Sequence, residues 1–334
     1  TTEEAAFYAG DRGYRNHFGE KVCISGDGQR VVATDPSNNG VYVFRKSGTS
    51  WLQEYKVPIA YYDPSIELDY EGKTLLIGNS TDETTEIPRT GSVAVYTRAN
   101  TSWAYSSKIE LSAAVLSGNE GLGKSVSVNS SGDLCVVGCP GFNVDGVAMG
   151  AAFIFARDGH IWSQRSRLTP TDGLAGDGFG NAVSMSNNGT KVVVAASNAT
   201  RFGSWYSGNA YVYKNMLEFW QEEGILSPSD RSNSLYFGRS IAMSGDGQRV
   251  IVGTIAGRAY IYKFGTSWSQ EARLDKGGYF GRSVSIDLSG SRAIVGDAAY
   301  SVGDVYPSVG CAYTFSRTGS SWSAGTAVLP SNKK

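Results

Sequence analysis

Apolar positions along the chain alternate with small or polar positions in short segments that recur at regular intervals. Residues 126–128 and 284–286 show this two-residue period, which places successive side chains on opposite faces of a strand. Asp-Gly or Asn-Gly pairs follow several of these segments, as at residues 246–247, and a continuous Val/Ile run comes next, as at residues 192–194. Such pairs favour tight hairpins because the turn requires positive φ. No segment shows a 3.6-residue period with helix caps, so the pattern predicts an all-β protein.

The pattern belongs to an internal repeat that occurs six times. Each copy opens with an aromatic or apolar residue, usually followed by Gly, and continues through four predicted strands. The copies begin near residues 18, 62, 122, 179, 237 and 280. Six Trp residues share one place in the copies: Trp51, Trp103, Trp162, Trp220, Trp268 and Trp322. Four antiparallel strands repeated at this spacing predict a β-propeller, whose ring protects the sheet edges.

The expected architecture is an all-β propeller of six four-stranded antiparallel blades, forming a single domain over residues 1–330 with a polar tail at residues 331–334. Seven blades are the alternative, because residues 1–17 precede the first full copy and include a segment suited to a strand of the last blade. Two β-sandwiches fit less well, because a sandwich does not require Trp at the same place in every repeat.

Phe-Gly pairs open four of the copies, as at residues 237–238, and a Gly-Cys-Pro sequence stands at residues 138–140. With these motifs the chain resembles the FG-GAP repeat family of integrin α-subunit propellers over residues 18–329. The resemblance implies an extracellular or cell-surface interaction or adhesion module. Integrin-type repeats also bind calcium between their first two strands, but that connection here is a tight turn with one acid, as at residues 25–28. No metal and no cofactor are therefore expected.

Composition narrows the function further. Lys and Arg total 30 against 31 Asp and Glu, so the net charge of −1 argues against nucleic-acid binding through a basic surface. The chain contains no apolar run of about 18 residues, so no membrane span is expected. Its two histidines, His17 and His160, fall on opposite predicted faces and do not suit a zinc site or a Ser-His-Asp triad. With no catalytic motif found, the chain is predicted not to be an enzyme.

The loops indicate where a partner binds. In an up-and-down blade the first and third connections lie on one face, and these are short here. The other face carries long connections at residues 79–91, 139–149, 197–207 and 297–309, and long loops on a rigid scaffold usually carry binding. Exposed Tyr and Trp suit protein interfaces and the flat faces of sugars. The candidate partner-binding residues are Trp205, Tyr206, Tyr300, Tyr306, Tyr61, Tyr62 and Asp177.

Three functions are compatible with these features. The leading hypothesis is a non-catalytic adhesion or assembly module that binds a protein or glycan through the loop-rich face, within a larger surface assembly. The second is a lectin, with a sugar stacked on Trp205 or Tyr206. The third is a polysaccharide lyase or hydrolase, which requires a carboxylate or Tyr cluster over the central channel.

Modification sites and thiols refine the expected location. Five glycosylation sequons fall in predicted loops or turns and favour a secreted or surface glycoprotein. They begin at Asn79, Asn100, Asn129, Asn188 and Asn198. The cysteines are expected to be mostly free and buried, because Cys135 and Cys139 are too far apart along a strand to form a disulfide. The alternative is one bridge between Cys23 and Cys311, which fall in the first and sixth blades and adjoin on ring closure.

The innermost strands contain one candidate ion pair. Lys21 and Glu67 are the charged residues at positions that are otherwise small in the repeat. Because the first two blades are neighbours and inner strands line the channel, we expect an ion pair between them.

Overall fold

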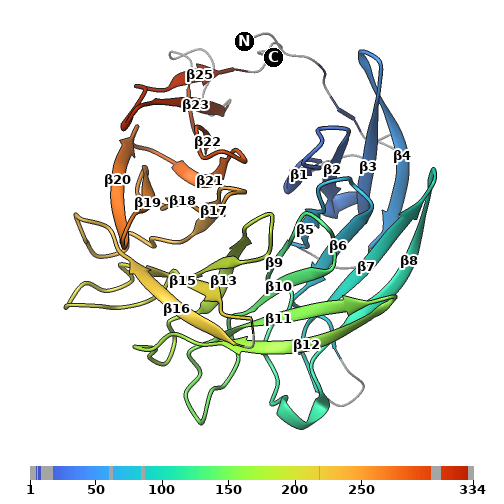
Figure 1. Ribbon diagram of the computed structural model, residues 1–334, viewed down its shortest axis with the longest axis horizontal. Helices are drawn as coiled ribbons and strands as arrows, with labels where there is room; N and C mark the ends of the chain where they lie inside the picture. The colour runs from blue at the N-terminus through green and yellow to red at the C-terminus, as the bar shows by residue number, and fades with distance from the viewer. Residues whose placement is uncertain are drawn as a thin grey trace.

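The chain forms six antiparallel sheets arranged as the blades of a propeller (Figure 1). This computed structural model describes residues 5, 7–8, 18–59, 63–83, 87–217, 219–301 and 310–329. The six-bladed all-β prediction is confirmed. The four strands of each blade are called A to D from the channel outward, and the blades are numbered in chain order.

The first three blades are regular four-stranded sheets. Blade 1 contains β1 (Val22–Ile24), β2 (Arg30–Asp35), β3 (Gly40–Ser47) and β4 (Ser50–Pro58). Blade 2 contains β5 (Ser65–Leu68), β6 (Thr74–Asn79), β7 (Ser92–Ala99) and β8 (Ser102–Ile109). Blade 3 contains β9 (Ser125–Val128), β10 (Leu134–Cys139), β11 (Ala151–Asp158) and β12 (Ile161–Leu168). Two short 3-10 turns, η1 (Pro36–Asn38) and η2 (Ala113–Val115), lie in connections.

The last three blades follow the same order, and strand D of blade 6 is divided in two. Blade 4 contains β13 (Phe179–Met185), β14 (Lys191–Ala196), β15 (Asn209–Asn215) and β16 (Trp220–Leu226). Blade 5 contains β17 (Ser240–Met243), β18 (Arg249–Gly253), β19 (Arg258–Phe264) and β20 (Trp268–Asp275). Blade 6 contains β21 (Phe280–Ile286), β22 (Arg292–Asp297), β23 (Cys311–Thr318), β24 (Ser321–Trp322) and β25 (Thr326–Val328).

The hydrophobic core lies between neighbouring sheets. Strand B of one blade packs against strand A of the next, so both faces of strand B are buried and its Val/Ile run is continuous rather than alternating. In blades 4, 5 and 6 the Phe of the Phe-Gly pair closes one end of this core. Phe237, for example, is fully buried and packs edge-on against Tyr260 at 5.5 Å between ring centroids.

Near the channel, neighbouring blades are joined by a Ser–Gly interlock. Ser65, Ser125 and Ser240 each donate a hydrogen bond to the carbonyl of the next blade's opening Gly, over 2.8, 2.9 and 2.9 Å. That carbonyl approaches a strand B glycine of the donor blade so closely that a Cβ on Gly138 would lie 2.0 Å from the Gly180 oxygen. The interlock explains why four of the six copies have glycine in strand B and serine in strand A.

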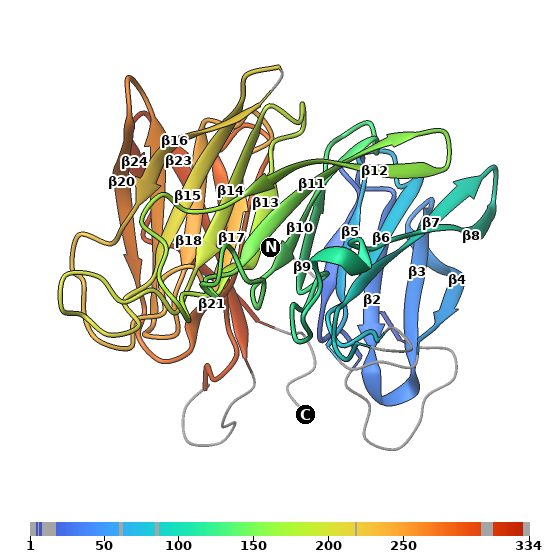
Figure 2. The ribbon, with the colours of Figure 1, turned by 90° about the horizontal axis from the view of Figure 1, so that it is seen from below.

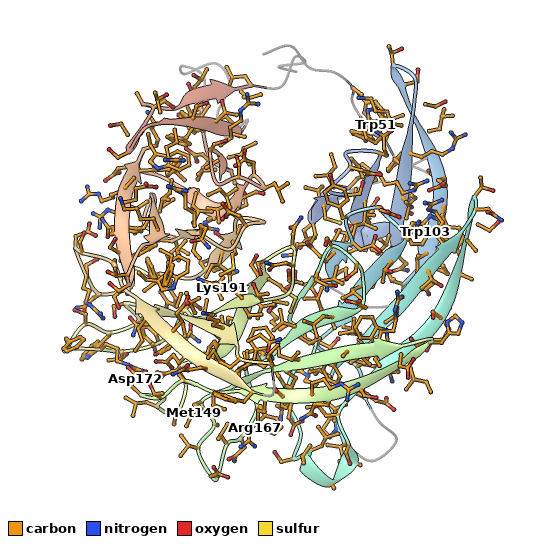
Figure 3. The ribbon with its side chains drawn as sticks, viewed as in Figure 1. Trp51, Trp103, Met149, Arg167, Asp172 and Lys191 are labelled. Atoms are coloured by element: carbon orange, nitrogen blue, oxygen red, sulfur yellow. The ribbon has the colours of Figure 1, made fainter. Side chains whose placement is uncertain are left out.

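At the outer rim, the repeated Trp binds a glutamate of the preceding blade. Trp103 Nε1 donates to Glu54 Oε2 over 3.1 Å, and Glu54 also pairs with Arg30 at 3.0 Å. The same Trp–Glu–base clamp joins blade 5 to blade 4 and blade 6 to blade 5. Its members there are Trp268, Glu223 and Lys191, then Trp322, Glu271 and Arg249. Trp103 and Lys191 are labelled in Figure 3, at two of these clamped junctions.

The six blades form an open arc. In Figure 1, β1 and β21 lie on opposite sides of the opening, whereas the inner strands of the other neighbours are adjacent. Apolar side chains of β1 are accordingly exposed, with Val22 at 65% and Ile24 at 60%.

Candidate functional site

The most exposed aromatic side chains of the elaborated face gather on two loops beside blade 4. Residues 197–208 connect β14 to β15, and residues 227–239 connect β16 to β17. Figure 2 shows these two connections together at the lower left. Phe202, Trp205 and Tyr206 from the first loop are 88%, 67% and 46% exposed, and Tyr236 comes from the second. We call Phe202, Trp205, Tyr206 and Tyr236 the aromatic loop patch.

Hydrogen bonds hold the two loops together. Trp205 N donates to Asn233 Oδ1 over 2.9 Å, and Trp205 O accepts from Ser234 N over 2.8 Å. Tyr236 N donates to Tyr206 O over 2.9 Å, and the two rings stack with an interplanar angle of 4° at 5.3 Å. The aromatic surface is therefore organised before any partner arrives.

Three residues of the aromatic loop patch have a left-handed backbone. The φ angles of Phe202, Tyr206 and Tyr236 are 53°, 53° and 50°. This region is uncommon for bulky residues and persists where surrounding contacts hold it, often at functional loops. Here the bonds between the loops supply those contacts at Tyr206 and Tyr236.

An ion-pair network fixes the loop of residues 197–208 to the connection between blades 3 and 4. Arg201 binds Asp172 through Nε at 2.9 Å and Asp177 through Nη2 at 2.6 Å, and Tyr211 Oη donates to Asp172 over 2.6 Å. Burial works against ionisation of Asp172, but the hydrogen bonds from Arg201 and Tyr211 outweigh it and lower its pKa. The network ties residues 197–208 to the connection between blades 3 and 4, which contains Asp172 (labelled at the rim in Figure 3).

A cation also lies beside the aromatic loop patch. The guanidinium of Arg231 lies 4.8 Å from the centroid of the Phe202 ring, and Arg231 Nη1 donates to Asn209 Oδ1 over 3.4 Å. This contact orients one face of Phe202 and adds positive charge next to it.

The structure brings together only part of the predicted binding set. Trp205 and Tyr206 lie on one surface, as just described. Tyr300 lies in blade 6, where it packs edge-on against Tyr313 at 6.1 Å between ring centroids. Asp177 is only 3% exposed and is bound to Arg201, so it supports the loop instead of facing a partner. Tyr61, Tyr62 and Tyr306 lie outside the described residues.

Phe202 was missed by sequence reasoning, although it is the most exposed member of the aromatic loop patch. The available signal was its position, three residues before Trp205 in the same loop outside the repeat.

The predicted ion pair between Lys21 and Glu67 is wrong. Lys21 Nζ lies 2.9 Å from Asp63 Oδ1, and Lys124 Nζ lies 2.7 Å from Asp63 Oδ2. Asp63 precedes β5 and is reached from blades 1 and 3 alike. Burial opposes its ionisation, but the bonds from Lys124 and Lys21 outweigh this and lower the pKa of Asp63. Glu67 has no ion pair within the described part of the chain, and burial raises its pKa to about 8.

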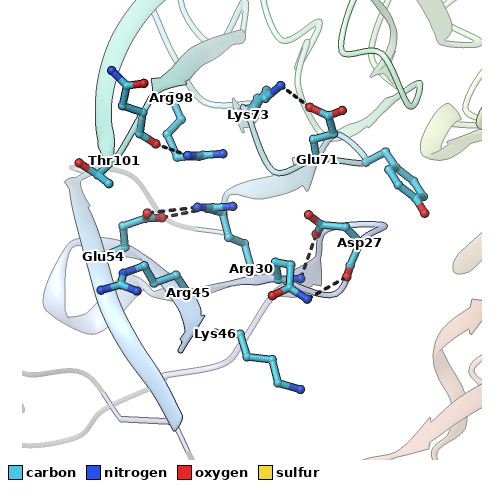
Figure 4. A pocket seen from close by; sticks show the side chains of 12 residues that line it. Asp27, Arg30, Arg45, Lys46, Glu54, Glu71, Lys73, Arg98 and Thr101 are labelled. Carbon is cyan, nitrogen blue, oxygen red and sulfur yellow. Dashed lines mark hydrogen bonds and ion pairs between the residues drawn. The ribbon is translucent and has the colours of Figure 1, made fainter. Parts of the chain in front are cut away.

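On the opposite face, a cavity of about 740 Å³ lies between blades 1 and 2. Two ion pairs join four of its eight charged side chains. Arg30 pairs with Glu54, Lys73 pairs with Glu71, and Arg98 donates to the Asn100 carbonyl, as Figure 4 shows. This cavity is therefore an ion-paired crevice, and the aromatic loop patch is the better candidate site.

The glycosylation sites differ in exposure. Asn100 and Asn188 are exposed and Asn198 is half-buried, so these stay predictions. Asn79 and Asn129 are only 8% and 6% exposed. Asn129 Nδ2 donates to Ser131 and to Asp133, which leaves no room for a glycan on that nitrogen.

The four cysteines are free, as predicted: Cys23, Cys135, Cys139 and Cys311. Over the described ranges, no three His, Cys, Asp or Glu side chains are placed to share a metal ion. The same part of the chain contains no helix with the length and apolar character to cross a membrane.

Comparison with known proteins agrees with the repeat architecture. No curated protein shows significant similarity to the chain. Residues 162–213 and 220–262 match the model of the FG-GAP repeat, and the matched segments run from strand D of blade 3 into blade 5. Taken with the six blades, these matches support a β-propeller that contains FG-GAP repeats.

Proposed function

We propose that the chain is a non-catalytic interaction module that binds a protein partner through the aromatic loop patch, outside the cell or at its surface. The observation that carries this proposal is the exposure of Phe202, Trp205 and Tyr206 on loops whose backbone is already held in place. Aromatic side chains on a preformed surface are typical anchors of protein interfaces, because little conformational freedom is lost on binding.

The surroundings of the aromatic loop patch support a protein partner. Arg231 contributes a positive charge beside Phe202, and the Asp172 side chain is 41% exposed nearby in the network of Arg201. Aromatic residues with Arg at the centre and polar groups at the rim are the usual composition of such interfaces. Propellers of the FG-GAP family are typically non-catalytic and typical of extracellular proteins, in keeping with the proposed role and location.

Site-specific photocrosslinking tests the proposal. A photoreactive phenylalanine analogue replaces Trp205 in one sample and Tyr105 in a control sample. Tyr105 is 57% exposed on β8, in a different blade. With extract from the native source, we expect one protein adduct from position 205 and none from position 105. Binding of the identified partner should weaken at least tenfold in Phe202→Ala, a loss of about 1.4 kcal/mol or more.

Two results contradict the proposal. One is equal crosslinking from both positions, which indicates non-specific adsorption. The other comes from a glycan array probed with the wild-type chain and with Trp205→Ala. A sugar signal that disappears in Trp205→Ala, without any protein adduct, makes the module a lectin.

A further inference from the structure

The opening of the arc exposes two faces that are buried or half-buried at the junctions between neighbouring blades. In blades 2 and 3, the apolar residues of strand A are almost covered by the preceding blade. Their exposures are 8% for Ile66, 5% for Leu68, 7% for Val126 and 8% for Val128. The corresponding residues of blade 1, Val22 and Ile24, are 65% and 60% exposed.

Blade 6 has the complementary exposed face. The middle of strand B is fully buried in blades 4 and 5, at Val193 and Ile251. The corresponding residue of blade 6, Ile294, is 43% exposed because no next blade covers it. An apolar strand face of this kind is covered by a strand A everywhere else in the arc.

The open face of blade 6 also keeps two residues of the Ser–Gly interlock, the donor serine of strand A and the glycine of strand B. At the junction of blades 5 and 6, Ser240 donates to the Gly281 carbonyl, and a Cβ on Gly253 would lie 2.0 Å from that oxygen. Ser283 and Gly296 hold the same positions in blade 6. Gly296 meets only atoms of Ser283 from its own blade, and Ser283 Oγ has no hydrogen-bond partner among the described residues.

The Phe-Gly pair of blade 1 has no preceding blade to contact. A Cβ on Gly281 would lie 2.3 Å from the Arg258 carbonyl of the preceding blade, whereas a Cβ on Gly19 would meet nothing within 4 Å. Gly19 nevertheless has a φ of 88°, close to the 95° of Gly281. The docking conformation therefore forms without a neighbour.

We propose that the open face of blade 6 is an interaction surface for a β-strand of a different protein, one that presents an aromatic–glycine pair followed by alternating apolar and small residues. The strand would dock as β21 docks on blade 5. Its aromatic ring caps the core, its glycine carbonyl accepts from Ser283, and its apolar residues cover Ile294. The surface repeats the packing of strand A on strand B that the arc forms at five junctions, three of which carry the Ser–Gly interlock, and this defines the chemistry of the occupant.

Blade 1 of the same chain does not supply this strand in the structure. Val22 and Ile24 of β1 are 65% and 60% exposed, and Ile294 of β22 is 43% exposed, so neither face covers the other. A strand that covers Ile294 therefore comes from another polypeptide.

A peptide that copies residues 235–245 of this chain tests the proposal, since it contains Phe237-Gly238 and the strand A pattern. With a fluorescent label, its binding is followed by anisotropy. We expect saturable binding to the wild-type chain and at least a tenfold weaker affinity for Ile294→Asp. Ile225→Asp is the matched control, because Ile225 is 41% exposed on the outer strand β16. A second variant, Ser283→Ala, removes only the hydroxyl donor and should weaken binding by a smaller factor.

Three results would overturn the proposal. One is the absence of peptide binding to the folded wild-type chain. Another is equal binding to Ile294→Asp and Ile225→Asp. The third is a concentration-dependent dimer in sedimentation that Ile294→Asp abolishes, since a second copy would then be the occupant.

Discussion

A buried indole nitrogen at the junction of blades 2 and 3 allows the Trp–Glu–base clamp to be tested by gain of stability. Trp162 Nε1 is buried and has no hydrogen-bond partner in the described part of the chain. In blades 1, 4 and 5 a glutamate stands three residues after the repeated Trp, and blade 2 has Ser106 at this position. We expect Ser106→Glu to provide the missing acceptor and to stabilise the fold.

The size of the effect follows from the contacts. A buried donor without a partner costs about 1–3 kcal/mol, and a hydrogen bond to a carboxylate contributes about 1.5–3 kcal/mol. Blade 2 has Thr74 where the clamped blades have Arg or Lys, so desolvation of the new carboxylate offsets part of this gain. Arg157, stacked 5.7 Å from the Trp162 ring, compensates in part. The expected net gain is about 1 kcal/mol, or a rise in Tm of roughly 1–2 °C for a chain of this length.

Urea unfolding of four proteins isolates the interaction: wild type, Ser106→Glu, Trp162→Phe and the double variant. The gain should appear in the wild-type background and vanish when Phe replaces the indole. A gain of equal size in both backgrounds would refute the reasoning, because the new carboxylate would then act through other groups.

Two further predictions concern the inner strands. Burial raises the pKa of Glu67 to about 8 from 4.5, so the folded state retains a proton that the unfolded state loses. Wild-type stability should therefore fall as pH rises from about 4.5 to 8, by less than about 1.4 kcal/mol per pH unit, and urea unfolding of Glu67→Gln should show no such fall. Gly138→Ala should destabilise the fold by over about 2 kcal/mol, because its Cβ meets the Gly180 carbonyl of the backbone. Gly296→Ala should lower the unfolding midpoint by less, because its Cβ meets only the Ser283 hydroxyl, at 2.3 Å, which can rotate away.

The repeat made the architecture predictable from sequence because its signals are local. Asp246-Gly247 determines a turn by itself, and Phe237-Gly238 recurs at a spacing that only a stack of similar sheets explains. The position of Trp205 in a long loop outside the repeat was likewise sufficient to predict its exposure, which is 67%.

The errors arose where the partner of a side chain is set by tertiary contacts. Lys21 and Glu67 occupy matching strand positions, but Asp63 in the preceding loop comes within 2.9 Å of the lysine. Asp177 looked like an exposed loop acid, yet Arg201, 24 residues later, buries it. Strand periodicity carries no information about such loop-to-strand distances.

The uneven distribution of the outer clamps has a mechanical consequence. Junctions 1/2, 4/5 and 5/6 carry the clamp, whereas blade 2 has Ser106 and blade 3 has Arg165 in the glutamate position. In a linear array, cooperativity depends on the coupling between nearest neighbours. Blades 4 to 6 should therefore move as one rigid unit and blades 1 and 2 as another. Blade 3 should be the flexible part between them. Under load, or in hydrogen exchange, the outer strands of blade 3 should open first, and the width of the opening in the arc would change with them.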